Sequence, residues 1–283
     1  MVVDKLVLLS PTISHKLGKL AREEGGPTAG YERCIDFRRT RLGLPARLFY
    51  RGRYNKIHKL EIIGVARLGL PYTQKLVERI FPNLLRVRIY RIDFCVDILG
   101  YSPWFFVTNL LLARHQNYAL YRSRGAVSLY LQFSKQRKLV FYDRLRLLRK
   151  ERNPMARLYA YHDHLTRIEL QLSGAAVPFK RFMDIQRYAE LRPVKHVRMM
   201  RFQVEVDHHT AVKRLAAYGL RWLISKCGLQ PTARMFSSPE WAALRNTYLR
   251  EIRGIRVPRI GYLMRKSVRR WLKGQIYFPR ARS

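Results

Sequence analysis

Two acidic residues of one strand and one of another have the spacing of a metal site. Asp93 and Asp97 lie four residues apart in the alternating run 86–99, so both point to the same face of a strand. Glu169 lies in a second alternating run, 164–172, together with Arg167. Carboxylate oxygens that converge from adjacent strands suit Mg²⁺ or Mn²⁺ and leave positions for phosphate oxygens. We therefore favour a divalent metal at Asp93 and Glu169.

The alternative for each acid is a simple ion pair with one of the many arginines of the chain. Glu205 and Asp207 share another strand face and precede two histidines, where a turn is favoured over a metal site. His162 and His164 flank Asp163 and could form a ligand pair. Because Asp163 is not apolar, we favour histidines that lie at the surface or contact phosphate.

The charge of the whole chain points to an anionic partner. The 283 residues include 56 Lys and Arg against 19 Asp and Glu, a formal net charge of +37. Such a surface binds polyanions, and arginine grips phosphate through two parallel hydrogen bonds. A GC-rich genome would explain arginine over lysine, but it would not explain the shortage of acids. We therefore expect contact with nucleic acid.

Cysteines and apolar runs bear on the compartment. The 3 cysteines have no Cys-x-x-Cys spacing, which argues against a zinc ribbon or a disulfide framework. The most apolar run, 104–113, is too short to cross a membrane, and Asp4 and Lys5 interrupt the first apolar residues. These patterns predict a cytoplasmic protein that does not enter a membrane.

The elements that must position these residues follow from periodicity. Alternating runs predict strands at 86–99, 127–133, 138–142, 164–172 and 200–206, with helices between them. We expect an α+β fold with a mixed, largely antiparallel central sheet and flanking helices over residues 1–209. A basic helical region is expected over 210–283, in which Val212, Leu215 and Trp222 form part of a buried helix face.

A last helix is predicted after Pro258, with one apolar and one basic face. The basic face is expected to contact DNA phosphates, although such a helix also suits an anionic membrane or a partner protein. Its residues are Arg259, Arg265, Lys266, Arg269, Arg270 and Lys273.

Three sequence blocks resemble a known family. They are RIDFCVD at 91–97, LYLQF at 129–133 with LVFYDRLRLL at 139–148, and RIEL at 167–170. In order and rough spacing they are similar to the conserved blocks of rolling-circle replication initiators of plasmids and filamentous phages, which are related to conjugative-element relaxases. The resemblance covers roughly residues 60 to 200.

The resemblance implies a protein that nicks and rejoins one DNA strand through a phosphotyrosine intermediate. It implies that Asp93, Asp97 and Glu169 bind Mg²⁺ or Mn²⁺ or support its ligands, and that Arg91 and Arg167 hold these carboxylates or the phosphate. Its partner is origin DNA, both single strand and duplex, with a host helicase and a second copy of the chain as further candidates.

The tyrosine block and the nucleophile depart from the family pattern. Tyr142 matches the tyrosine block, in which Arg144 stands where the family usually has lysine. The nucleophile is expected soon after the RIEL strand, where this chain has Phe179. Tyr188 is the first tyrosine downstream and therefore our candidate, with Tyr159 and Tyr161 as alternatives.

Three other functions remain open. A conjugative relaxase would perform the same chemistry at a transfer origin. A non-catalytic DNA- or RNA-binding protein that lost the tyrosine is the second alternative, and Phe179 favours it. A ribosome-associated basic protein is the third, and it would prefer RNA.

Overall fold

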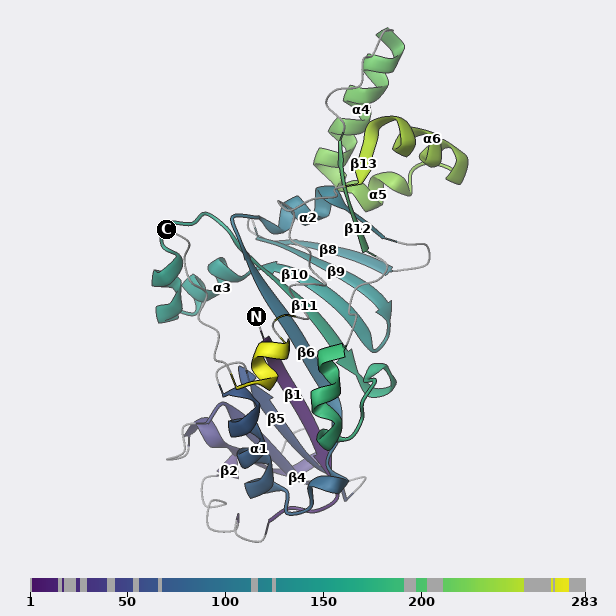
Figure 1. Cartoon of the computed structure of the whole chain (residues 1–283). Helices are drawn as coiled ribbons and strands as arrows, with labels where there is room; N and C mark the ends of the chain where they lie inside the picture. Colours follow the sequence, from purple (N-terminus) through teal and green to yellow (C-terminus); the bar gives the residue numbers. More distant parts are fainter. Residues whose placement is uncertain are drawn as a thin grey trace.

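A ten-stranded antiparallel sheet forms the body of the molecule (Figure 1). The computed structural model describes residues 2–14, 17, 24–25, 30–39, 44–52, 56–65, 68–112, 117–123, 126–190, 197–202, 211–251, 266 and 268–274. The strand order is β2-β3-β4-β5-β1-β6-β11-β10-β9-β8. The strands are β1 (Val2–Ser10), β2 (Glu24–Gly25), β3 (Tyr31–Asp36), β4 (Ala46–Gly52), β5 (His58–Ile63), β6 (Arg88–Leu99), β8 (Asn117–Ser123), β9 (Ala126–Ser134), β10 (Arg137–Asp143) and β11 (Leu165–Ser173). The predicted α+β fold with a largely antiparallel sheet is confirmed.

Strand β6 shows why the sheet has one apolar and one polar face. Ile92, Phe94 and Ile98 alternate with Asp93 and Asp97, so apolar and acidic side chains leave the strand on opposite sides. The apolar set is buried in the main core. β6 pairs with β1 and β11, both antiparallel, which puts its acids in the middle of the sheet.

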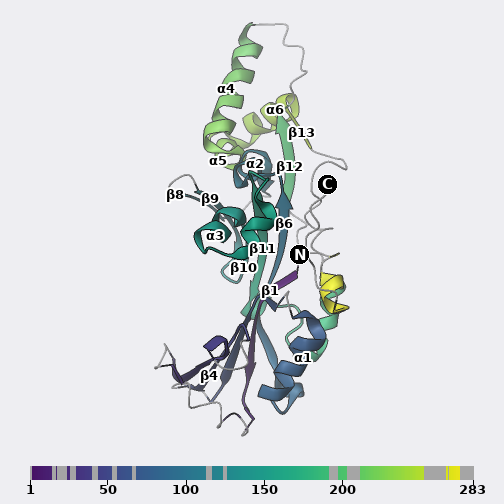
Figure 2. The same cartoon turned by 90° about the vertical axis from the view of Figure 1, so that its left-hand side faces the viewer.

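Helices cover the apolar face. They are α1 (Gly69–Ile80), α2 (Pro103–Asn109) and the 3-10 helix η8 (Phe182–Glu190), and all three contribute to the main core. Further 3-10 turns are η3 (Phe37–Arg39), η5 (Leu84–Arg86) and η7 (Gly174–Ala176). On the polar face, α3 (Arg144–Lys150) and η6 (Pro154–Tyr159) cover only one end, where Leu148 and Tyr159 pack on Leu165 and Leu99. Figure 2 shows α1 and α3 on opposite sides of the sheet.

A second, smaller core lies beyond one end of the sheet. It is built by α4 (Ala211–Cys227), α5 (Leu229–Ala233) and α6 (Ser238–Tyr248) (Figure 1). Ser237 and Glu240 form a capping box that starts α6. A three-stranded sheet of β7 (Leu110–Leu112), β12 (Val197–Phe202) and β13 (Leu249–Glu251) links this part to the body.

The structure corrects the predicted packing of α4. Val212, Leu215 and Trp222 are exposed at 78%, 76% and 60%, whereas Ala217 and Leu220 are buried. The helix turns the face of Ala217, Leu220 and Ile224 toward the second core, so the predicted buried face is wrong.

The last described segment of the chain packs on the main core and not on α4 to α6. Residues 268–272 are helical, and Val268 and Trp271 belong to the main core. The Trp271 indole donates a hydrogen bond to the Val65 carbonyl at 3.3 Å. The predicted boundary at 209 and the predicted helix start at Pro258 lie outside the described residues. Among the described helices, none is long and apolar enough to cross a membrane.

Candidate active site on the polar face of the sheet

Arg167 and Asp97 face each other across β11 and β6. The Arg167 guanidinium donates to both Asp97 oxygens, from Nε to Oδ1 at 2.6 Å and from Nη2 to Oδ2 at 2.8 Å. Its Nη1 also donates to Asp4 Oδ1 at 3.2 Å. Burial alone would raise the pKa of Asp97, but the charge and hydrogen bonds of Arg167 outweigh burial and keep this pKa below its usual value. Arg167 is thus committed to two carboxylates.

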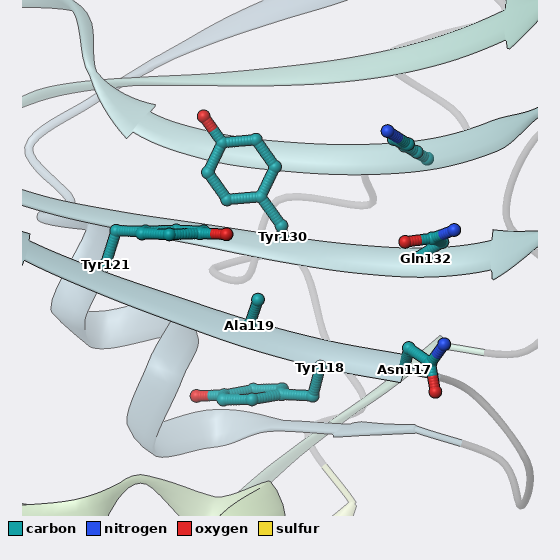
Figure 3. A pocket seen from close by; sticks show the side chains of 7 residues that line it. Asn117, Tyr118, Ala119, Tyr121, Tyr130 and Gln132 are labelled. Carbon is teal, nitrogen blue, oxygen red and sulfur yellow. The ribbon is translucent and has the colours of Figure 1, made fainter. Parts of the chain in front are cut away.

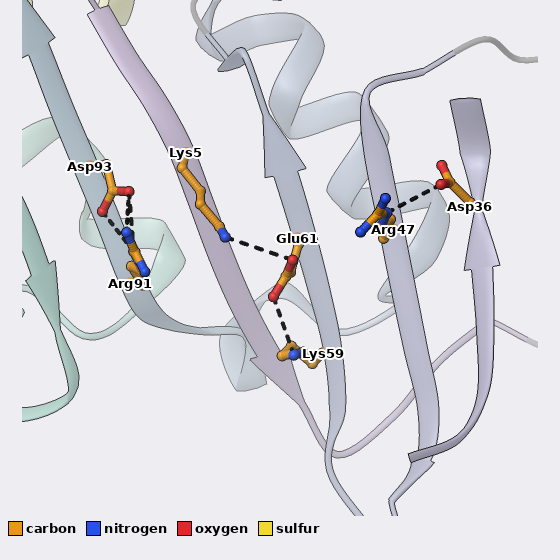
Figure 4. A network of polar contacts seen from close by, with 7 residues as sticks. All are labelled: Lys5, Asp36, Arg47, Lys59, Glu61, Arg91 and Asp93. Carbon is orange, nitrogen blue, oxygen red and sulfur yellow. Dashed lines mark hydrogen bonds and ion pairs between the residues drawn. The ribbon is translucent and has the colours of Figure 1, made fainter. Parts of the chain in front are cut away.

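Asp93 forms a similar pair with Arg91 within β6 (Figure 4). Arg91 Nε donates to Oδ1 at 2.8 Å and Nη2 donates to Oδ2 at 2.8 Å. Asp93 is only 3% exposed, and this burial raises its pKa to about 6 despite the guanidinium. The negative charge of Glu169 raises it further. Asp93 therefore interacts electrostatically with a second carboxylate, Glu169, on the neighbouring strand.

Glu169 connects this acidic pair to a tyrosine. Tyr142 donates its hydroxyl proton to Glu169 Oε1 at 2.5 Å, and Gln171 Nε2 donates to Oε2 at 3.2 Å. Burial and the adjacent Glu169 raise the pKa of Tyr142 well above its usual range. A hydroxyl bonded to a carboxylate has the geometry of a nucleophile with its base. The sheet register produces this contact, because β10 pairs with β11 and places Tyr142 opposite Arg167.

Arg144 follows Tyr142 closely and adds positive charge beside it. Its charge lowers the pKa values of both Tyr142 and Asp97, although other effects are larger. The N-cap residue Asp143 starts α3 here by accepting a hydrogen bond from the Arg146 amide at 3.0 Å. Arg144 Nε is buried and has no hydrogen-bond partner among the described residues. It is a cation with a free donor next to the Tyr142–Glu169 pair.

The three acids predicted to bind a metal are on one sheet face, but each has its own partners. In the part of the chain that the structure describes, no three His, Cys, Asp or Glu side chains are grouped so as to hold a metal ion. Both Asp97 oxygens accept hydrogen bonds from Arg167, and the negative charge of Glu169 raises the pKa of Asp93. The oxygens of the other two acids also accept hydrogen bonds, from Arg91 to Asp93 and from Tyr142 and Gln171 to Glu169. By type, carboxylate oxygens are the ligands that Mg²⁺ and Mn²⁺ prefer.

Tyr188 lies on the opposite face of the sheet. Its side chain is 0% exposed, and its hydroxyl donates to the Phe179 carbonyl at 3.0 Å. The ring packs on Phe94 and Phe179, with centroids 5.6 and 5.1 Å away. Phe94 points away from Asp93 because successive side chains of a strand alternate. Tyr188 therefore lies on the other face of the sheet from Asp93 and Glu169.

The alternative tyrosines and the histidines do not join the site. Tyr159 is buried against α3, and Tyr161 is fully exposed in the turn before β11. His164 is exposed and His162 half-buried, and neither belongs to a described metal-binding group. Glu205, Asp207 and the histidines at 208 and 209 lie outside the described residues.

The predicted basic face is described in part. Lys266, Arg269 and Lys273 are exposed, and Arg270 is half-buried. Arg259 and Arg265 lie outside the described residues. The exposed residues flank the buried Trp271, so they form the outer side of a helical turn anchored to the core.

Sequence reasoning missed two contributors to the site, Asp4 and Gln171. Gln171 could have been found, because it alternates with Glu169 on the same strand. Asp4 had no local signal, because its contact with Arg167 spans 163 residues and depends on strand order.

Comparisons with known proteins give a similarity to solved structures but no match to a sequence family. No protein-family model matches the chain, and no curated protein matches it. Among solved structures, the chain is similar to the rolling circle replication initiator protein from Geobacillus stearothermophilus. The TM-score is 0.41 and the sequence identity 13%, over 80% of this chain and 98% of that one.

Proposed function

We propose that this chain is a rolling-circle replication initiation protein that nicks and rejoins one DNA strand, with Tyr142 as the nucleophile. The observation that carries the proposal is the Tyr142–Glu169 hydrogen bond on a polar sheet face lined with arginine. A net charge of +37 supplies the affinity for DNA. The sequence blocks that resemble rolling-circle initiators contain these same residues.

In the proposed step, Tyr142 Oη forms a bond to the scissile phosphorus while the bond from phosphorus to the 3′ oxygen breaks. Glu169 accepts the phenolic proton as attack proceeds, which is needed because the raised pKa keeps the free hydroxyl protonated at neutral pH. The 3′ oxygen leaves and takes up a proton from solvent. The product is a 5′-phosphotyrosine and a free 3′ hydroxyl, and rejoining reverses each change.

The two arginines of the site have different roles. Arg167 is held by Asp97 and Asp4, so it positions strands and shields the negative charge near Tyr142. Arg144 has a buried free donor, so it is the residue that would bind a phosphate oxygen and stabilise charge in the transition state.

Mg²⁺ or Mn²⁺ is the proposed cofactor, held by Asp93 and Glu169. Bound there, a divalent cation neutralises and orients the scissile phosphate. A cation there would favour the ionised form of Asp93 and so oppose the effect of burial, which raises its pKa. Arg91, which donates to Asp93, would keep this carboxylate aligned.

The proposal is tested with supercoiled DNA that carries the coding region of the protein, in Mg²⁺ or Mn²⁺. We expect open circles and denaturant-stable protein–DNA adducts from the wild type. Tyr142→Phe should abolish both, and Glu169→Gln should slow nicking by about 100-fold or more. Tyr188→Phe is the matched control and should nick like the wild type. Full nicking by Tyr142→Phe would refute the assignment.

A non-catalytic nucleic-acid-binding protein is the second candidate function. The burial of Tyr188 and the presence of Phe179 at the position where the family places its tyrosine favour it. It predicts binding without any covalent adduct. A conjugative relaxase differs from the first proposal only in the DNA element that is nicked.

The proposed function also implies a DNA partner and a cellular compartment. We expect origin DNA as the partner and the cytoplasm as the compartment. A host helicase and a second copy of the chain stay predicted partners.

A further inference from the structure

A pocket opens at the edge of the sheet that is formed by β8 (Figure 3). Its volume is about 340 Å³, and residues of β8, β9 and β10 line it. Three tyrosines line it, and two of them are exposed, Tyr121 at 62% and Tyr130 at 36%. Their ring centroids are 5.1 Å apart at an interplanar angle of 82°. The two rings thus form an aromatic patch that is open to solvent.

The sheet register connects this pocket to the candidate active site. Tyr130 pairs with Val140, and Val140 pairs with Glu169. All three therefore lie in one row across the sheet, and all point to the same face. Two strand spacings of about 4.8 Å separate Tyr130 from Glu169, roughly 10 Å in all. An extended nucleic-acid strand could occupy both places with a few nucleotides.

The remaining lining residues match the chemistry of unpaired nucleotides. Asn117 and Gln132 form a cross-strand pair whose amides can donate to and accept from base edges. Lys138 adds a cation that can reach a phosphate. Among the described residues that line the pocket, none is acidic. In duplex DNA the base faces are stacked on one another, so only an unpaired strand can use the exposed rings.

We propose that Tyr121 and Tyr130 form a stacking platform for bases of single-stranded DNA. The platform would hold the strand beside Tyr142 while Lys138 contacts its backbone. This inference rests on the proposed function for the identity of the strand, because a nickase must hold unpaired DNA at its active site. The aromatic pocket itself does not depend on any catalytic residue.

The test compares binding of a fluorescent 12-nucleotide single strand and a duplex of the same sequence by anisotropy at fixed salt. Tyr121→Ala with Tyr130→Ala should weaken single-strand binding by about 10- to 100-fold and leave duplex binding within twofold. Tyr130→Phe keeps the ring and should bind like the wild type. Tyr72→Ala removes a tyrosine that is 49% exposed on α1, on the other face of the sheet, and should change neither affinity.

A second readout locates the contact. Single-stranded DNA that contains 5-iodouracil should crosslink under light to the peptide that contains Tyr130, and the alanine variant should lose this crosslink. Unchanged single-strand affinity in the double alanine variant would overturn the proposal. An equal loss for single strand and duplex would do the same. Tighter, tyrosine-dependent binding of an RNA of the same sequence would overturn DNA as the occupant.

Failure of the platform and failure of the proposed function give different results. If the wild type nicks DNA and the double alanine variant binds single strands normally, the platform is wrong and the function stands. If no adduct forms but binding depends on the two rings, the platform stands and the nickase proposal is wrong.

Discussion

The acids Asp93 and Asp97 on the polar face of the sheet each form an ion pair with an arginine. Asp97 and Arg167 are the most enclosed pair, with side-chain exposures of 20% and 11%. An arginine buried to this extent is costly without its carboxylate. The pair therefore stabilises the junction of β6 and β11 as well as positioning the site.

Asp97→Asn should lower the free energy of unfolding by about 3 kcal/mol, because Arg167 keeps only Asp4 as an anionic partner. Urea denaturation at pH 7 measures the change. The lowered pKa of Asp97 means that its contribution is present above the unfolded pKa and is lost as pH falls through the folded one. The variant should thus differ least from the wild type in acid. Asp163→Asn, at an exposed position, is the control and should change little.

Asp93 should show the opposite pH dependence. Its folded pKa of about 6 lies above the unfolded value of about 3.9, so the folded state binds a proton that the unfolded state lacks between these values. Stability from this group is present below the unfolded pKa and is lost as pH rises through about 6. The unfolding free energy of the wild type relative to Asp93→Asn should therefore fall between pH 4 and pH 7. A difference that rises over this range would contradict the buried environment of Asp93.

If Asp93 and Glu169 hold the ion, saturating Mn²⁺ should restore the stability that is lost when Asp93 ionises. We expect the melting temperature of the wild type at pH 7 to rise with Mn²⁺, because a ligand that binds only the folded state stabilises it. Asp93→Asn should lose most of this rise, while Asp163→Asn should keep it. Equal shifts in all three proteins would place the cation elsewhere.

Strand alternation predicted which charged residues share a face but not how they pair. Arg91, Asp93 and Asp97 could be placed together from the sequence, because their spacing in β6 is even. That Arg167 occupies both oxygens of Asp97 depends on the register of β6 with β11, whereas Arg91 reaches Asp93 within β6 itself. Tyr188 could not be placed, because η8 carries it back across the sheet to the face of Phe94.

At the scale of elements, Gly228 governs how the C-terminal helices attach to the body. It separates α4 from α5 with a φ of +96°, a conformation that other residues rarely adopt. A Cβ atom there would lie 2.5 Å from Val107 Cγ1 and 3.0 Å from the Val107 carbonyl oxygen in α2. The close approach of α5 to α2 therefore requires glycine.

Gly228→Ala should destabilise the protein by more than about 1 kcal/mol, through backbone strain and displacement of α2. Thermal unfolding gives the magnitude, and hydrogen exchange should show faster opening of α4 and α5. Gly219→Ala is the matched control, because this helical glycine has open space around its Cα. It should stabilise α4 by about 0.5–1 kcal/mol. Similar effects at both positions would contradict the contact with α2.

Element existence was more predictable than element packing. The expected strands at 127–133, 138–142 and 164–172 agree with β9, β10 and β11 to within one residue at each end, because their alternation is strict. The buried face of α4 was not predictable, because apolar side chains lie on both sides of the helix, with Leu220 buried and Leu215 exposed. Hydrophobic spacing indicates a helix face but not which partner covers it.

For the whole molecule, we expect the net charge of +37 to dominate its binding to nucleic acid. Duplex binding should weaken steeply with salt, with log K falling by about 0.9 per neutralised phosphate for each unit of log salt. Replacing Lys266, Arg269 and Lys273 by alanine should reduce this slope by up to about 3, if each contacts one phosphate. Titrations at several salt concentrations measure both slopes. Equal slopes would remove this basic surface from the duplex contact.

Charge and composition predicted a nucleic-acid partner, whereas the arrangement of the basic segment was not predictable. The turn at 268–272 returns to the main core through Trp271, a contact with Val65 that spans 206 residues. The basic residues of this turn, such as Arg269, therefore lie on the same body as the candidate site, although they are far from it in the sequence.

The role of Tyr142 as the nucleophile is tested most directly by identifying the residue that becomes linked to DNA. Wild-type protein is incubated with supercoiled DNA that carries its own coding region, denatured, digested with nuclease and protease, and analysed by mass spectrometry. A nucleotide attached through its 5′ phosphate to Tyr142 is the result that we predict. A nucleotide on Tyr161, Tyr188 or any other residue would contradict the site built around Glu169.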